Sequence, residues 1–468
     1  MIPDTAIKEL LRILGPERLI RDPAGMSAYG HDATEIEALP DAVAFPQNSP
    51  EISAILKLAN RTPFFVIPRG AGTGKTGGAV PIQGGLVLSL ERLNRIIEID
   101  ADNLIARVEP GVITAHLQAA VERLGLFYPP DPASLNVSTL GGNVAECAGG
   151  LRAVKYGVTR DYILGLKVVL PTGELIDTGV RTAKGVVGYD LTRLIIGSEG
   201  TLAIITEITL RLLPKPANKK TMLAYFPQVT AAVAMVAEII RQRVIPTTLE
   251  LMDRLCLECV QAETGLAIPE GAKALLLIEV DGEEPMTTLE TAKIRGLCAQ
   301  GGALVFQAAM GPEEAEKMWD ARRKVSETIG RLAPNKMSED IVVPRSRMAE
   351  LISFLEASGK KHSLAIPCFG HAGDGNIHVN IMYDKQKPDQ TRAALVIVEA
   401  LFRKVLEMQG TISGEHGIGL TKAPYLSLEL APPALELMAR LKKSFDPNGI
   451  LNPGKIFVKK SEQESEEI

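Results

Sequence analysis

The sequence is poor in aromatic residues and carries no excess of positive charge. Aromatic residues make up 4% of its 468 residues, with a single tryptophan, and the formal net charge is −5 at pH 7. A protein that holds a nucleic-acid backbone needs a basic surface, and one that binds single strands needs aromatic rings for stacking. These two deficits exclude nucleic acid as an expected partner.

Long apolar runs are also missing. The most apolar helical stretch, residues 229–240, is far too short to cross a bilayer, and the first ten residues lack the basic and apolar regions of a secretory signal. The five cysteines are scattered and odd in number, as is typical of a reducing compartment. We therefore expect a cytoplasmic protein without a transmembrane segment, either free or peripheral at the inner face of the membrane.

Two of these cysteines form a C-x-x-C pair, Cys256 and Cys259. A structural zinc site needs a second pair of ligands, and none follows. The pattern around them is that of a helix face, so we expect two half-buried thiols without redox or metal chemistry.

The length of the chain and its Gly/Pro-rich breaks predict more than one domain. Residues 1–215 alternate short apolar runs with Gly/Pro breaks and predict an α/β mixture with several strands. A Pro- and Lys-rich stretch at 214–220 marks a junction. The alternating pattern of 216–410 predicts a second, α+β domain. It is followed by a Gly/Pro-rich C-terminal segment, 411–458, and an acidic tail, 459–468.

The strongest local signal is the glycine-rich segment 68–81, PRGAGTGKTGGAVP. It ends like a P-loop, but Arg69 stands where the first glycine is required, so the spacing is one residue short. The following Gly77-Gly-Ala-Val-Pro81 cannot start the helix that a P-loop or a Rossmann fingerprint needs. Two readings remain: a loop whose backbone amides wrap an anion, or a strained turn without a ligand.

Two further segments have the same small and hydroxylated character. Residues 128–150 contain STLGGN followed by a second glycine pair, and residues 197–206 read GSEGTLAIIT. Three such loops in one domain suggest an extended cofactor that backbone amides contact along its length.

Three of the six histidines fall in two short motifs, F-G-His371-A-G-D-G-N-I-His378-V-N and S-G-Glu415-His416-G. The small residues between His371 and His378 predict a tight turn that brings both imidazoles to one point. With a nearby carboxylate they would form a two-histidine, one-carboxylate site for a divalent metal. Glu415 and His416 are adjacent, so their side chains are expected to diverge, one toward a metal and one toward a substrate.

Taken in order, P-R-G-x-G-T, S-T-x-G-G-N, K-Y-G-V-T-R-D and G-S-E-G-T-L resemble the FAD-binding domain of the vanillyl-alcohol-oxidase-type flavoproteins. Within that group the chain is similar to the glycolate oxidase FAD subunit and to the D-lactate and D-2-hydroxyglutarate dehydrogenases, over nearly its whole length. The resemblance implies an α+β fold, with a two-part FAD-binding domain and an α+β substrate or cap domain built on an antiparallel sheet. The glycine-rich segment holds no histidine, so the FAD is expected to be non-covalent.

The resemblance implies FAD contacts in several separate segments. The residues concerned are Arg69, Gly70, Ala71, Gly72, Thr73, Gly74, Gly77, Gly78, Pro130, Asp131, Ser134, Ser138, Thr139, Gly141, Gly142, Asn143, Gly150, Gly200, Thr201, Ile204 and Asn452. Without the resemblance, Asn452 reads as a capping residue in a Gly/Pro turn.

The resemblance also assigns roles to the histidine motifs. It makes His371, His378 and Glu415 ligands of a divalent metal, commonly zinc, and His416 the catalytic base. Asp374 and Asn380 would support the ligands or contact the substrate.

Residues 319–326 resemble the family's W-x-x-R helix, and this resemblance implies that Arg322 binds a substrate carboxylate, with Ser326 one turn further along the same face. The alternative is an exposed arginine on a charged helix face. Lys336 cannot be aligned with the lysine that binds substrate in some members of the family, so no role is assigned to it.

The implied function is that of an FAD- and metal-dependent dehydrogenase. It would oxidise a small D-2-hydroxy acid (D-lactate, glycolate or D-2-hydroxyglutarate) to the 2-oxo acid by hydride transfer to flavin N5. Without a cysteine cluster for iron–sulfur centres, its electrons must leave to an iron–sulfur subunit, a quinone or an electron-transfer flavoprotein. Two alternatives stay open: the flavin subunit of a multi-subunit glycolate oxidase, and a transferase like the alkyl-glycerone-phosphate synthases. A homodimer is compatible with either.

Overall fold

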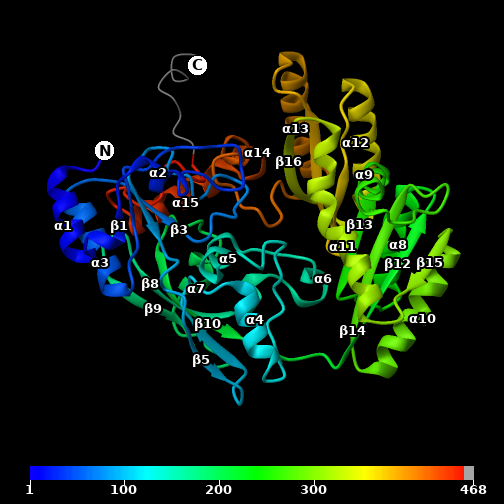
Figure 1. The fold of residues 1–468 in the computed structure, drawn as a ribbon, viewed down its shortest axis with the longest axis horizontal. Helices are drawn as coiled ribbons and strands as arrows, with labels where there is room; N and C mark the ends of the chain where they lie inside the picture. Colours follow the sequence, from blue (N-terminus) through cyan, green and yellow to red (C-terminus); the bar gives the residue numbers. More distant parts are fainter. Residues whose placement is uncertain (458–468) are drawn as a thin grey trace. The chain divides into compact units, whose positions relative to one another are not determined.

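The computed structural model describes residues 1–457, and the chain divides into two compact units. Unit 1 contains residues 1–148, 158–215 and the chain from residue 415 onward, so it includes both the blue beginning and the red end of the ribbon in Figure 1. Unit 2 contains residues 149–157 and 216–414. The nine residues 149–157, which the sequence assigns to the first domain, therefore belong to the second unit. The predicted acidic tail lies outside the described residues.

Unit 1 has two main sheets. The first is four-stranded in the order β1-β2-β4-β3, with β4 parallel to β2 and β3 and with β1 antiparallel to β2. The second is five-stranded and antiparallel in the order β5-β6-β10-β8-β9, and β7 and β11 form a separate pair. The strands are β1 Leu19–Ile20, β2 Ala42–Ala44, β3 Val66–Arg69, β4 Leu86–Ser89, β5 Ile96–Asp100, β6 Ile105–Val108, β7 Leu126–Phe127, β8 Ile163–Val169, β9 Leu175–Gly179, β10 Ile204–Arg211 and β11 Leu213–Pro214.

The helices of unit 1 pack on these sheets. They are α1 Asp4–Leu14, α2 Pro23–Ser27, α3 Ser49–Arg61, α4 Thr114–Glu122, α5 Leu140–Glu146, α7 Leu191–Ile195, α14 Leu426–Glu429 and α15 Pro432–Phe445. One apolar cluster joins α1 and α3 to strands β2, β3 and β4, and it also takes in Ile450 and Leu451 near the end of the described chain. Residues more than 350 positions apart in the sequence thus share one core.

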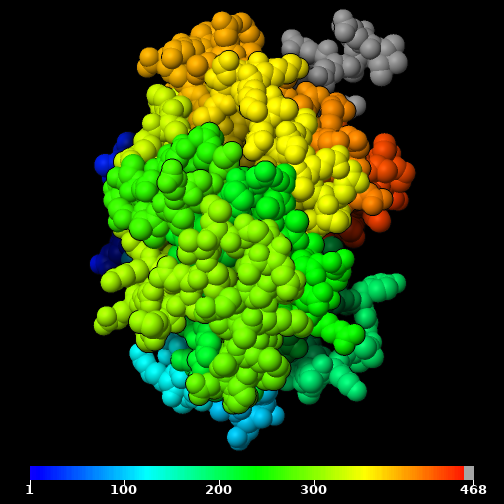
Figure 2. Space-filling model, turned by 90° about the vertical axis from the view of Figure 1, so that its right-hand side faces the viewer, coloured from blue at the N-terminus to red at the C-terminus, as the bar shows by residue number. Residues whose placement is uncertain are grey.

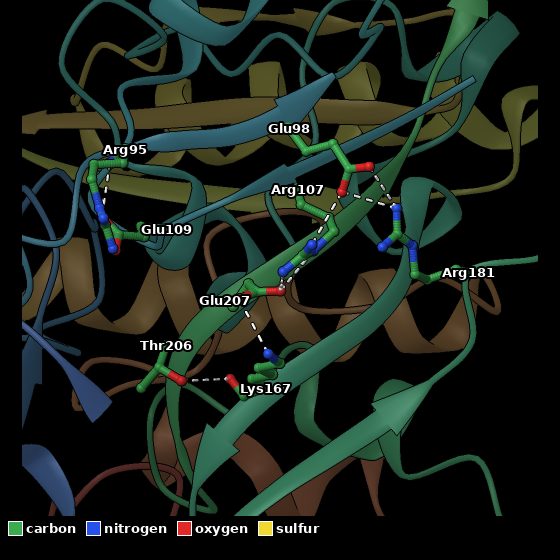
Figure 3. Close-up of polar contacts among 8 residues, drawn as sticks. All are labelled: Arg95, Glu98, Arg107, Glu109, Lys167, Arg181, Thr206 and Glu207. Carbon is green, nitrogen blue, oxygen red and sulfur yellow. Dashed lines mark hydrogen bonds and ion pairs between the residues drawn. The ribbon is translucent and has the colours of Figure 1, made fainter. Parts of the chain in front are cut away.

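A ladder of ion pairs crosses the five-stranded sheet (Figure 3). Arg107 on β6 contacts Glu98 on β5 and Glu207 on β10, and Lys167 on β8 lies 3.5 Å from Glu207. Glu98 also pairs with Arg181 beyond β9. Opposite charges on neighbouring strands stabilise the register of an antiparallel sheet.

We expect Glu207→Gln to lower the free energy of unfolding by about 1 kcal/mol, because it removes the carboxylate shared by two cations while keeping the side-chain shape. Urea unfolding at low and high salt measures the effect, which should shrink at high salt. The matched control is Glu9→Gln, whose pair with Arg61 is largely exposed and should contribute almost nothing. Equal losses in both variants would contradict a stabilising role for the ladder.

Unit 2 is built on one seven-stranded antiparallel sheet in the order β15-β12-β14-β13-β17-β18-β16. Its strands are β12 Asn218–Phe226, β13 Thr248–Asp253, β14 Ala274–Gly282, β15 Val305–Ala308, β16 Asn335–Val342, β17 Cys368–His371 and β18 Asn376–Tyr383. All positions of β14 except the last are buried, as are all those of β18. Since side chains alternate between the two faces of a strand, both faces of this sheet are covered.

Helices cover the sheet of unit 2. They are α6 Ala153–Tyr156, α8 Val229–Arg241, α9 Arg254–Thr264, α10 Glu284–Gln300, α11 Pro312–Thr328, α12 Met348–His362 and α13 Pro388–Glu407. Helices α9 and α11 form one apolar cluster with β12, β13 and β14. Cys256 and Cys259 are buried on α9, which confirms the interpretation of their motif as a helix face. In Figure 2 the side chains of residues 216–414 are coloured from green through yellow to orange.

The predicted fold class, with strands and helices mixed in both units and an antiparallel sheet in the second, is confirmed. Among residues 1–457 no helix combines the length and the apolarity that crossing a membrane requires.

Candidate active site

The glycine-rich segment leaves strand β3 at Arg69 and contains no helix between residues 70 and 85. This confirms that it is neither a P-loop nor a Rossmann turn. Gly77 has a φ of +83°, and a Cβ atom there would lie 2.8 Å from the side chain of Leu420. The loop therefore passes close to the C-terminal segment of unit 1, which only glycine at this position allows.

A cavity of about 810 Å³ opens beside this loop in unit 1. Its lining residues are Ala28, Tyr29, Arg69, Gly70, Ala71, Glu91, Asn94, Ile96, Gly111, Val112, Ile113, His116 and Thr139. Four of these were predicted as cofactor contacts. The others are Ala28 and Tyr29 and residues of the segments 91–96 and 111–116, which carry no motif and were missed.

Arg69 lines the cavity but is itself 6% exposed. Its guanidinium donates to the carbonyl oxygens of His31 (2.6 Å) and Ala28 (3.4 Å) and lies over the ring of Tyr29. The side chain therefore fastens residues 28–31 to the end of β3. The sequence suggested a cation at the entrance of the loop, whereas the structure shows one tied to backbone carbonyls.

The STLGGN segment enters helix α5 through a network of hydroxyl groups. Thr139 accepts a hydrogen bond from the amide of Gly142 at the start of α5 (3.3 Å). The Thr114 hydroxyl lies 2.9 Å from the Ser138 hydroxyl, and it accepts a hydrogen bond from the side-chain amide of Asn143 (2.8 Å). Thr114, which no motif indicated, thus holds two of the predicted residues in place.

Asn452 joins two of the predicted loops. Its Nδ2 donates to the carbonyl oxygens of Gly78 (3.1 Å) and Glu199 (2.8 Å), while its buried Oδ1 has no hydrogen-bond partner among residues 1–457. A buried acceptor without a partner is costly, so this oxygen fits a donor group of a bound cofactor. With the glycine loop and the cavity, it makes unit 1 a suitable site for FAD.

The remaining predicted cofactor residues divide between the units. Gly72, Thr73, Gly74, Pro130, Asp131, Ser134, Gly141, Gly200, Thr201 and Ile204 lie in unit 1, whereas Gly150 lies in unit 2.

The segment that carries His416 is anchored to unit 1 by its backbone. The carboxylate of Glu199 accepts from the amides of Ile418 (2.7 Å) and Gly419 (2.6 Å), and the Thr76 hydroxyl donates to the His416 carbonyl (3.1 Å). His416 Nε2 lies 4.0 Å from a Glu415 oxygen. The prediction that these side chains diverge is wrong, because the segment is a bend and not a helix or strand, so the alternation rule does not apply.

A second carboxylate, Glu146, is half-buried near Glu199, with its Oε2 shielded from solvent. A Cβ at Gly417 would lie 2.4 Å from Glu146 and 3.0 Å from Glu199, so both carboxylates border the same glycine. Burial, together with the negative charges of Glu199 and Asp32, raises the pKa of Glu146 well above its usual value. Sequence reasoning missed both glutamates as members of this cluster.

In unit 2, His371 and His378 lie on the hairpin formed by β17 and β18. Their ring centroids are 5.2 Å apart, which confirms that the intervening turn brings the two imidazoles together. Gly375 in that turn has a φ of +88°, and a Cβ there would lie 2.1 Å from the Val343 carbonyl oxygen. Asp374 accepts from the Asn376 amide and shapes the same turn.

Asp340 on β16 stands opposite His378 on β18, with its Oδ1 3.7 Å from His378 Nδ1. It also accepts from the side-chain amide of Asn376 (2.6 Å) and from the backbone amide of Gly414 (2.9 Å). Glu415 and His416 follow Gly414 directly in the chain. Imidazole nitrogen and carboxylate oxygen form the donor set of a divalent metal such as zinc. Asp340 was missed.

The W-x-x-R motif lies on α11 and faces the sheet. Trp319 Nε1 donates to Glu279 (3.2 Å), and Arg322 Nε donates to Glu250 (2.8 Å). Arg322 is 8% exposed and lies over the ring of Phe369, so the alternative of an exposed surface arginine is wrong. Burial alone would raise the pKa of Glu250, but His371 and Arg322 outweigh it and hold that pKa below its usual value.

Ser326 and Asn380 lie on the same unit but make different contacts. Lys336 Nζ lies 3.2 Å from the Ser326 hydroxyl and 3.1 Å from its carbonyl oxygen. Asn380 accepts from the Ser338 hydroxyl (2.9 Å) and is fully buried. The structure thus places the side chain of Lys336 on β16, which the sequence left unassigned, beside Ser326, one turn of α11 beyond Arg322.

Two family models match the chain. The model described as FAD binding domain matches residues 40–179, and the one described as FAD linked oxidases, C-terminal domain, matches residues 215–456. The chain belongs to the FAD-linked oxidase family. Its members are FAD-dependent oxidoreductases, which agrees with the glycine loops and cavity of unit 1.

Characterised members of the family cover almost the whole chain. This oxidase is 45% identical over 460 residues to glycolate oxidase subunit GlcD of Bacillus subtilis, covering 98% of each chain. It is 35% identical over 463 residues to D-lactate dehydrogenase of Anaerostipes hadrus, covering 96% of this chain and 97% of the other. Its fold matches p-cresol methylhydroxylase with a TM-score of 0.81 at 17% identity, covering 97% of this chain and 96% of the other.

Proposed function

We propose that this FAD-linked oxidase oxidises a small D-2-hydroxy acid to the 2-oxo acid. The observation that carries the proposal is the buried group of unit 2, in which Arg322 stands beside the His371–His378 hairpin. A guanidinium is suited to a carboxylate, and two imidazoles are suited to a metal that binds a hydroxyl oxygen. A 2-hydroxy acid carries those two groups on adjacent carbons. D-lactate, glycolate and D-2-hydroxyglutarate are the candidate substrates, as the names of the relatives suggest.

Each group of the chain has a defined task in this reaction. Arg322 binds the substrate carboxylate with the N–H groups that Glu250 leaves available, since a guanidinium has five donors. Lys336 and Ser326 extend the polar surface next to it. His416 accepts the hydroxyl proton as general base. His371, His378 and Glu415 are the proposed metal ligands, with Asp340 as a further candidate.

The glycine loops and Asn452 would hold FAD in unit 1, and the bound flavin would supply the acceptor for the α-hydrogen as a hydride. A divalent metal, with zinc as the proposed ion, provides a lower pKa for the substrate hydroxyl.

The electrons must then leave the protein. We propose an iron–sulfur subunit as the acceptor, in line with the relative named as a glycolate oxidase subunit, with a quinone or an electron-transfer flavoprotein as alternatives. The proposed location is the cytoplasm or the inner face of the membrane.

The test is an anaerobic titration of the purified protein followed by visible absorption. We expect the flavin spectrum to bleach with one of D-lactate, glycolate or D-2-hydroxyglutarate and not with L-lactate, and the bleaching to disappear after chelator treatment. Re-addition of zinc should restore it. A flavin spectrum that no hydroxy acid bleaches would instead favour a transferase without net oxidation.

A further inference from the structure

Glu250 is a charged residue in the middle of a buried strand. It lies on β13, is 0% exposed, and stands on the same face of the sheet as α11. Its two oxygens have different partners: Oε2 accepts from Arg322 Nε (2.8 Å) and pairs with Nη2 (2.5 Å), and Oε1 lies 2.7 Å from His371 Nδ1. One carboxylate therefore joins the proposed substrate anchor to a proposed metal ligand.

The chemistry of these groups fixes the direction of both contacts. An ionised carboxylate only accepts hydrogen bonds, so the imidazole must donate through Nδ1. A neutral imidazole that is protonated at Nδ1 has its lone pair at Nε2, the atom with which such a histidine binds a metal. The same carboxylate holds the guanidinium plane by a two-nitrogen contact, which sets the direction of the remaining N–H groups.

We propose that Glu250 is a positioning residue that selects the metal-binding tautomer of His371 and orients Arg322 with the same charge. The inference rests on the proposed function, because it assigns roles to His371 and Arg322. It is specific to Glu250. The other buried glutamate on this face, Glu279, accepts hydrogen bonds from Thr221 and Trp319, and not from Arg322 or His371.

Glu250→Gln tests the tautomer directly. Arg322 can only donate, so the amide oxygen of the glutamine must face it and the NH₂ group must face His371. That NH₂ donates to Nδ1 and forces the proton onto Nε2, where it competes with the metal. The side chain keeps its shape, and the guanidinium keeps an acceptor.

We expect zinc affinity, measured by competition with a chromophoric chelator, to fall by about 10–100-fold in Glu250→Gln. Saturating zinc should restore most of kcat. A merely structural role would not give this rescue. The matched control, Glu279→Gln, should bind zinc as the wild type does. Melting temperatures of both variants, recorded without zinc, show whether each is folded.

Three results would overturn the inference: a zinc affinity of Glu250→Gln within twofold of the wild type, equal losses in Glu250→Gln and Glu279→Gln, or no zinc binding by the wild type. Its failure is separable from that of the proposed function. Flavin reduction by a D-2-hydroxy acid in the wild type tests the function, whereas the chelator competition needs no substrate. A wild type that binds zinc but is reduced by no hydroxy acid would leave the role of Glu250 toward His371 intact.

Discussion

Replacing His416 with alanine is expected to lower kcat by about 10²–10⁴-fold, the usual contribution of a general base. The loss should appear in flavin reduction at saturating substrate, measured by stopped-flow absorption. Because the backbone of this segment is held by Glu199 and Thr76 and not by the imidazole, the variant should keep its fold and its flavin.

The matched control is His362→Ala, at the end of α12 and outside every motif. It should leave the rate of flavin reduction unchanged. The flavin spectrum and the zinc content of both variants must match those of the wild type, so that a slow rate reports proton transfer and not a missing group. A His416→Ala rate within threefold of the wild type would rule out the base assignment.

Arg322→Met is expected to destabilise unit 2 strongly. It leaves the charge of Glu250 buried with only His371 as a partner, and breaking a buried pair in this way costs about 3–5 kcal/mol. Urea unfolding followed by circular dichroism should show the loss.

Two further variants separate the charge effect from the loss of packing. Adding Glu250→Gln to Arg322→Met removes the uncompensated charge and should recover most of the stability without recovering the KM for the hydroxy acid. Arg323→Met, one residue along α11, removes an exposed pair with Glu316 and should change stability by less than about 0.5 kcal/mol. No recovery in the double variant would mean that packing, not charge, explains the loss.

The sequence predicted the elements with strong local patterns. The helical sequence patterns of residues 285–300 and 114–124 correspond to α10, Glu284–Gln300, and α4, Thr114–Glu122. The turn between His371 and His378 was predictable for the same reason, since the small residues between the two histidines favour a tight turn.

The residues that sequence reasoning missed have partners far away in the chain. Glu250 lies 72 residues from Arg322 and 121 from His371 in the sequence. Only the folded structure therefore shows which groups its carboxylate contacts. Its one local signal was a glutamate in an otherwise apolar run, Thr248–Met252. The divergence of Glu415 and His416 was mispredicted because a rule for regular strands and helices was applied to a bend.

The interrupted path of the chain through unit 1 has a consequence for its synthesis. The strand β3 and its glycine loop leave the ribosome early, but the backbone of Val66 bonds Ile450 and pairs with Leu451, whose side chains complete the core around β3 and β4. Residues 216–414 of unit 2 form one continuous stretch and can fold while the chain is still growing. The flavin-binding half must wait for the last segment. A premature stop after α15 would leave every glycine motif in place and still leave the half of the protein that contains them unable to close its core.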